Sequence, residues 1–169
     1  MKALLYITLI FCVISCKKEA ATQEVEAETT TLQITKKDVS SLKYRQFLLD
    51  PRTVNSEEFW LKYDELRGIV SNVNQADFSF FKDNNEVLIA FIKDLKESIP
   101  EEINTPLIRA RLLALETKML KLEGIINLTN PDKKEVLLVL QDFLEAFSNL
   151  NLQINKKFEK EWQNIEKPY

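Results

Sequence analysis

Residues 131–154 read PDKKEVLLVLQDFLEAFSNLNLQI, and this stretch decides the fold class of the chain. Its apolar residues recur at alternating steps of four and three, which places them on one face of an α-helix. Such a stripe needs other apolar faces to pack against, so the stretch predicts one helix of a bundle. The members of the stripe are Val136, Leu140, Phe143, Phe147, Leu150 and Ile154.

Three earlier segments carry the same spacing, and together they predict helices at residues 56–75, 79–98, 106–127 and 131–165. Residues 54–59, VNSEEF, form a capping box with a hydrophobic staple, and Thr105-Pro106 and Asn130-Pro131 place a capping residue before a proline. Short connections make neighbouring helices antiparallel, so we expect an all-α, up-down-up-down four-helix bundle. Flanking residues expected to widen the stripes are Phe91, Leu113, Leu120 and Leu144.

Composition agrees with a single globular domain. The chain has 169 residues, 45% hydrophobic and 29% charged, with only 2 Gly. Its formal net charge of -3 argues against a nucleic-acid partner, because binding to phosphates needs many basic residues. We therefore expect no nucleic-acid binding.

The first sixteen residues have the pattern of an export signal. Met1-Lys2 supplies a positive start, and residues 3–14 are apolar except for Thr8. The apolar run is short for a membrane-spanning helix. Both cysteines, Cys12 and Cys16, lie in this region, so the rest of the chain has no thiol.

The end of this signal, Val13-Ile14-Ser15-Cys16, resembles the lipobox of bacterial lipoproteins. The resemblance implies a diacylglycerol linked to Cys16, cleavage before it, and acylation of the new amine, which together anchor a protein stably to a membrane. The alternatives are an ordinary cleaved signal or an N-terminal membrane helix. Lipoproteins retained at the inner membrane tend to have Asp after the cysteine; Lys17 stands there instead, so the resemblance favours the outer membrane of the cell envelope.

A polar stretch follows Cys16. Residues 17–37 show no apolar periodicity, and about 20 residues of flexible chain have a typical reach near 25 Å. We therefore divide the chain into a signal peptide (1–15), a lipidated cysteine with a flexible linker (16–37) and a helical bundle domain (38–169).

The fourth predicted helix exceeds the others in length by roughly 20 Å. Residues 38–49 form a short amphipathic stretch of matching length, and we expect it to be an extra N-terminal helix packed on residues 155–165. Aromatic residues, among them Trp60, Phe158 and Trp162, would then gather at that end. They predict either a secondary core cluster or a contact for a protein partner or an apolar ligand.

The inventory of reactive groups predicts a protein that is not an enzyme and needs no cofactor or metal. The chain has no His, which excludes histidine-ligated zinc, the Glu-x-x-His di-iron bundle site and a histidine general base. We expect a membrane-anchored lipoprotein that acts by contact, as an envelope interaction or accessory module. The alternative is a helical bundle that binds or senses a small ligand.

Overall fold

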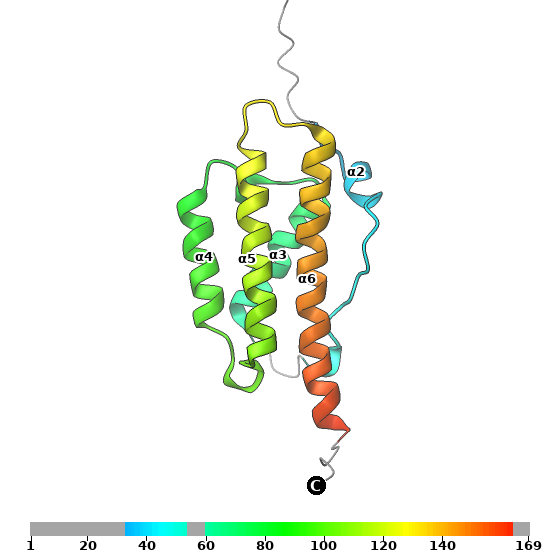
Figure 1. Ribbon diagram of the computed structural model, residues 1–169, viewed down its shortest axis with the longest axis vertical. Coiled ribbons are helices and arrows are strands. Elements are labelled where there is room, and N and C mark those ends of the chain that lie inside the picture. The colour runs from blue at the N-terminus through cyan, green and yellow to red at the C-terminus, as the bar shows by residue number, and fades with distance from the viewer. Residues whose placement is uncertain (1–32, 54–59, 164–169) are drawn as a thin grey trace, which may run out of the picture.

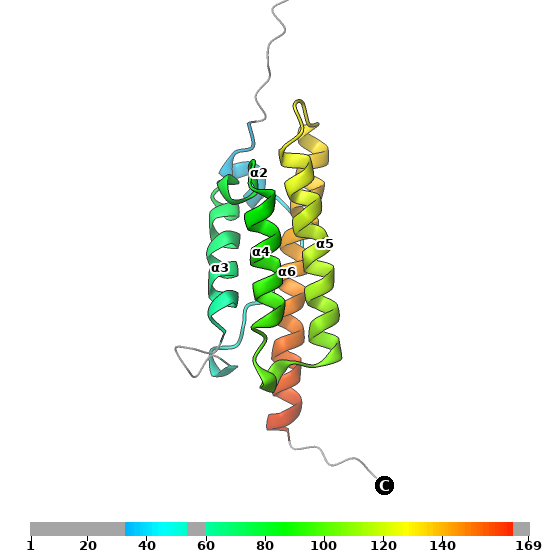
Figure 2. The same cartoon turned by 90° about the vertical axis from the view of Figure 1, so that its left-hand side faces the viewer.

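The computed structural model describes residues 33–53 and 60–163, and these residues form helices joined by turns and coil, without a β-strand. The four long helices of these residues lie side by side and run alternately up and down, which confirms the expected four-helix bundle (Figures 1 and 2). A short helix precedes them, and three short 3-10 helices occur in the connections. The elements are α2 (Lys36–Ser40), η2 (Pro51–Thr53), α3 (Leu61–Asn74), η3 (Ser79–Phe81), α4 (Asn85–Glu97), η4 (Glu101–Ile103), α5 (Pro106–Ile126) and α6 (Lys133–Trp162).

The predicted stripes form the core. Leu66, Leu88, Leu115 and Leu140, one from each long helix, are fully buried. Of the four flanking residues, Phe91 and Leu144 are buried, whereas Leu113 and Leu120 are 61% and 37% exposed. The stripe of α5 is therefore narrower than expected, because no helix of the described residues packs against its outer face.

Local capping sets the helix starts. Thr105 caps α5 by accepting a hydrogen bond from the Ile108 amide at 3.3 Å, with Pro106 in the first turn as expected. The expected start of α6 at Asn130-Pro131 is two residues early, because Asp132 is the cap and accepts from the Lys134 amide at 2.7 Å.

The second predicted helix is divided in two. Asp83 has a φ of 51°, which an α-helix cannot contain, and it separates η3 from α4. The side chain of Asn127, at the end of α5, accepts from the Asp83 amide and donates to the Phe81 carbonyl. These two bonds replace the helical bonds that residues 79–85 would otherwise make.

The α3 and α6 backbones stay further apart than the other neighbouring pairs, of which α5 and α6 pack most closely. At one end of the bundle, helix α2 contacts both α3 and α6. Its Asp38 carboxylate binds the Lys133 ammonium at 2.8 Å, at the start of α6. None of the helices in the described ranges is long and apolar enough to span a membrane.

The expected helix over residues 38–49 was wrong in extent and in place. Only residues 36–40 are helical, held by a capping box between Thr35 and Asp38, and they lie at the opposite end of α6 from residues 155–165. Residues 42–50, here called the strap, are non-helical and run along α6 away from α2 (Figure 1). The candidate site lies between the strap, α3 and α6.

Candidate functional site

Polar side chains of α6 hold the backbone of the strap. The Ser148 hydroxyl accepts a hydrogen bond from the Phe47 amide at 2.6 Å and donates one to the Arg45 carbonyl at 2.7 Å. The Asn151 amide donates to the Phe47 carbonyl at 3.0 Å. Ser148 and Asn151 are 1% and 2% exposed, so these bonds satisfy polar groups that would otherwise be buried without a partner.

The next polar residue on the same face of α6 continues the pattern. Asn155 donates to the Leu48 carbonyl and accepts from the Asp50 amide, both at 2.8 Å. The three α6 residues lie at steps of three and four, so they form one row along the helix that hydrogen-bonds an extended backbone. These bonds explain why the strap is not a helix. Its amides and carbonyls pair with side chains of α6, whereas in a helix they would pair with each other.

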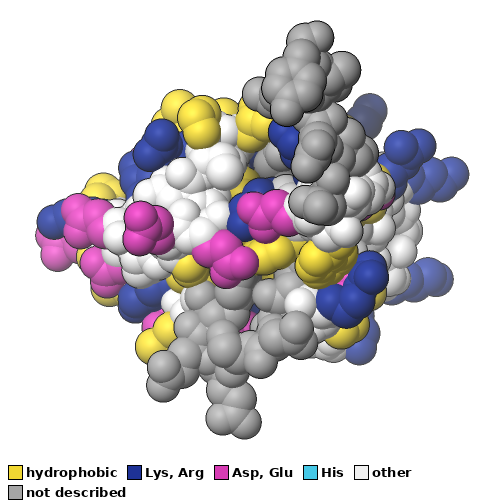
Figure 3. Space-filling view, turned by 90° about the horizontal axis from the view of Figure 1, so that it is seen from below, with side chains coloured by type: hydrophobic (Ala, Val, Ile, Leu, Met, Phe, Trp, Pro, Cys, Tyr) yellow, Lys and Arg dark blue, Asp and Glu magenta, His cyan; other side chains and the backbone are white. Residues whose placement is uncertain are grey.

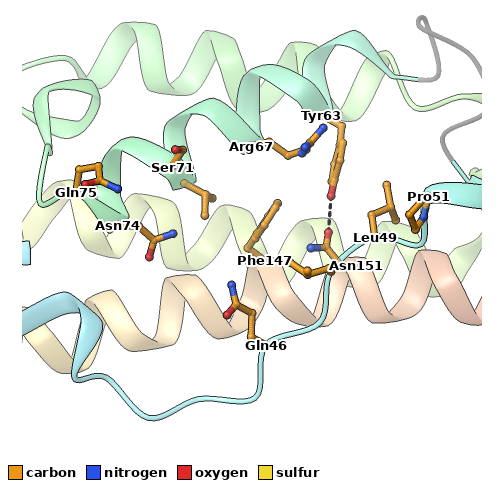
Figure 4. A pocket seen from close by; sticks show the side chains of 12 residues that line it. Gln46, Leu49, Pro51, Tyr63, Arg67, Ser71, Asn74, Gln75, Phe147 and Asn151 are labelled. Atoms are coloured by element: carbon orange, nitrogen blue, oxygen red, sulfur yellow. Dashed lines mark hydrogen bonds between the residues drawn. The ribbon is translucent and has the colours of Figure 1, made fainter.

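An open groove of about 690 Å³ lies between the strap, α3 and α6 (Figure 4). Its floor includes the buried ring of Tyr63, the buried Val70 and the half-buried Phe147. The Tyr63 hydroxyl donates to Asn151 at 2.7 Å, and the Tyr63 and Phe147 rings stack with centroids 6.0 Å apart. The complete lining is Gln46, Leu48, Leu49, Pro51, Tyr63, Arg67, Val70, Ser71, Asn74, Gln75, Phe147 and Asn151.

Several polar side chains of the groove have no hydrogen-bond partner among the residues that the structure describes. They are the amides of Gln46, Asn74 and Gln75 and the hydroxyl of Ser71. Figure 4 shows Ser71, Asn74 and Gln75 on the α3 side, across the groove from Gln46 on the strap. These groups are accessible to solvent and can therefore bind a ligand without first breaking an internal bond.

The electrostatics of the groove are nearly neutral. Arg67 is the charged residue of the lining, and it already binds Asp64 at 2.9 Å. Burial raises the pKa of the Tyr63 hydroxyl well above its usual value near 10, so Tyr63 stays protonated and serves as a hydrogen-bond donor. The lining thus suits uncharged polar and apolar groups.

A second groove, of about 590 Å³, lies between the start of α5 and the last turns of α6. Lysine side chains line it, but Lys157, the most buried of them, already binds Glu161 at 2.8 Å and lies 3.9 Å from Glu102. The most buried lysine of this groove is therefore already paired with carboxylates of the same chain. The groove beside the strap is the stronger candidate site.

The aromatic residues expected to form one cluster contribute to two separate ring contacts. Trp60 is 2% exposed, stacks on Tyr63 with centroids 5.7 Å apart, and donates its indole N–H to Ser98 at 3.1 Å. Phe158 is buried and stacks on Trp162 at 6.0 Å. Neither Trp60 nor Phe158 lines a groove described above, so both contribute mainly to the core.

Trp162 differs because it is 45% exposed at the far end of α6. The guanidinium of Arg52 lies 4.3 Å from the centre of its ring, and Asp50 fixes that guanidinium through an ion pair at 2.7 Å. Charged side chains of both signs, with hydrophobic ones between them, cover this end of the bundle (Figure 3). Residues 50–52 thus cover part of the helix end that we expected residues 38–49 to cover.

The groove was missed by sequence reasoning, although one signal for it was present. Ser148, Asn151 and Asn155 interrupt the apolar character of α6 at helical spacing, and two of them lie on the buried face. A row of buried polar residues on a bundle helix indicates a polar partner. Cys16, the predicted lipidation site, lies outside the described residues.

Comparisons with protein-family models, with curated proteins and with solved structures find no match to this chain. The site must therefore be interpreted from its own chemistry. In the described residues, no group of three or more Cys, Asp or Glu side chains is arranged to hold a metal ion. The groove offers an apolar floor, four amide or hydroxyl side chains with free hydrogen-bonding capacity, and little charge.

Proposed function

We propose that this chain is a lipid-anchored protein of the bacterial cell envelope that acts by binding a protein partner in the groove between the strap, α3 and α6. The observation that carries the binding role is the groove itself. Its apolar floor supplies contact area, and its unpaired amides and hydroxyl supply specificity, which is the usual division of labour in a binding site.

The chemistry of the lining supports binding and not catalysis. Among the described residues the lining contains no carboxylate, thiol or lysine, and the raised pKa of its buried tyrosine keeps that hydroxyl protonated and unavailable as a base. Of the lining residues that the structure describes, Ser71 is the one that carries a hydroxyl besides Tyr63, and none of them is a general base for it. These residues can hold a ligand but offer no group suited to proton transfer or nucleophilic attack.

The lipid anchor rests on the lipobox at residues 13–16. The described chain begins at Gln33, and its first helix binds the start of α6 through Asp38 and Lys133. A lipid on Cys16 would tether the bundle through this end, at the outer membrane in a cell that has one. The end that carries Trp162 is the one further from the tether, and the groove lies between the two ends.

Two measurements test this proposal. Cys16→Ala is expected to abolish incorporation of labelled palmitate and to release the protein from membranes while the bundle stays folded; label persisting on the variant would refute the lipid anchor. Photoreactive residues at Ser71 and Gln75 are expected to crosslink, in cells, to one identifiable protein, whereas the same residue at Asn72, which is outside the groove, should not. Equal crosslinking at all three positions would refute the groove as the site.

A small ligand is the alternative occupant, and the volume of the groove supports this alternative. About 690 Å³ falls within the range of small-molecule sites. Mass spectrometry of the protein purified under native conditions separates the two possibilities, because a retained small molecule would appear as a discrete mass increment that Ser71→Trp removes.

A further inference from the structure

The α3 wall of the groove presents the same kind of side chains that α6 uses to hold the strap. On α6, one serine and two asparagines within two helical turns bind the backbone of an extended segment. At the end of α3, Ser71, Asn74 and the C-cap residue Gln75 occupy a little more than one turn and face the groove (Figure 4). The α6 row therefore shows, within this chain, how side chains of the kind found on the α3 wall can bind an extended backbone.

The two rows differ in their occupancy. The hydrogen-bonding groups of the α6 row are already in use. Asn155, for example, donates to one strap carbonyl and accepts from one strap amide. The side chains of Ser71, Asn74, Gln75 and Gln46 make no hydrogen bond with described residues. A side-chain amide has two donor hydrogens and an acceptor oxygen, so each can pair with both the C=O and the N–H of a peptide.

The dimensions and the charge of the groove define the segment that it would take. The lining on α3 extends from Tyr63 to Gln75, which is about 18 Å at the helical rise. This length accommodates about five or six residues of extended chain. Val70 and Phe147 on the floor favour apolar side chains at alternate positions, and the one charged side chain of the described lining, Arg67, already has Asp64 beside it as a partner.

We propose that the groove binds an extended, uncharged peptide segment of the partner protein, with Ser71, Asn74, Gln75 and Gln46 holding its backbone. This inference rests on the proposed binding function and specifies the chemistry of the partner. The segment lies between the strap and α3, and its backbone is held by side chains as the strap is held by α6. Its alternate side chains face the floor.

A peptide-display experiment with the full-length chain in mild detergent tests the proposal. A library of random twelve-residue peptides is selected for binding, and affinities of the selected peptides are measured by fluorescence anisotropy. Asn74→Leu keeps the branch at Cγ and removes the amide, so it should weaken binding about tenfold. Asn72→Leu, on the same helix but outside the groove, should leave the affinity unchanged. Thermal unfolding of both variants verifies that the bundle is intact.

Methylation of single peptide amides separates an extended segment from a helical one. In an extended segment alternate amides point to opposite sides, so N-methyl groups should weaken binding at every second position. Selected peptides that bind as helices, equal losses for the two leucine variants, or the absence of any binder would each overturn the proposal. So would a Ser71 photo-crosslink to residues 17–32 of this chain or to a second copy. The broader binding function fails only if the in-cell crosslinks show no preference for the groove.

Discussion

Asn151 joins three parts of the site, and its replacement by alanine gives the most direct test of the structure. The side chain donates to the Phe47 carbonyl at 3.0 Å and accepts from the Tyr63 hydroxyl at 2.7 Å. Asn151→Ala leaves both partners without their bond, and each unsatisfied buried group costs about 1–3 kcal/mol. Because Tyr63 and Asn151 border the groove, water can reach part of this site and reduce the cost. We expect the free energy of unfolding to fall by about 2–4 kcal/mol.

Urea unfolding, followed by far-ultraviolet circular dichroism, measures this loss as a decrease of the midpoint by about 1–3 M. Asn149→Ala is the matched control, since Asn149 makes no side-chain hydrogen bond with described residues and its removal should cost less than about 0.5 kcal/mol. In a double-mutant cycle with Tyr63→Phe, the two losses should sum to more than the loss of the double variant. Equal losses for Asn151→Ala and Asn149→Ala, or strict additivity with Tyr63→Phe, would refute the assigned contacts.

Three other expectations follow from the same structure. A Cβ at Gly124 or Gly68 meets no atom within 4 Å, so alanine at either helical position should raise the free energy of unfolding by about 0.5–1 kcal/mol; a lower thermal midpoint would contradict this. The raised pKa of Tyr63 means that its stabilising effect is complete below about pH 10 and is lost as the pH rises further, so the phenolate absorbance of wild-type and Tyr63→Phe protein should diverge only above that pH. The Lys133 ammonium, with Thr35, holds the pKa of Asp38 far below its usual value, so the docking of α2 should weaken as the pH falls below about 4, and amide exchange in residues 36–40 should lose this dependence in Asp38→Asn.

The bundle could be predicted from the sequence because its determinants are local and periodic. The spacing of Leu112, Leu115, Met119 and Leu122 identifies the buried face of α5 without knowledge of any other element. The capping signal at Thr105-Pro106 likewise acts within one turn, and the structure confirms it. Helix spacing and caps therefore supplied most of the architecture.

The strap and the groove could not be predicted in the same way. Residues 42–50 have enough apolar residues for an amphipathic helix, but their backbone partners are side chains about one hundred positions later in the chain. The groove depends on how far α3 stands from α6, which no local pattern encodes. The exposure of Leu113 also follows from an arrangement of whole helices, since the spacing alone placed it beside the core.

The route of the strap has a mechanical consequence. Tension on a lipid-linked N-terminus would enter the bundle through α2, where the contact between Asp38 and Lys133 takes the first load. Beyond it, the strap lies along α6, so a pull on its N-terminal end acts along its own length. The five hydrogen bonds from Ser148, Asn151 and Asn155 would then be sheared together and not peeled open one after another. These hydrogen bonds would therefore resist a pull on the N-terminal end of the strap before the load reaches η2 at its other end.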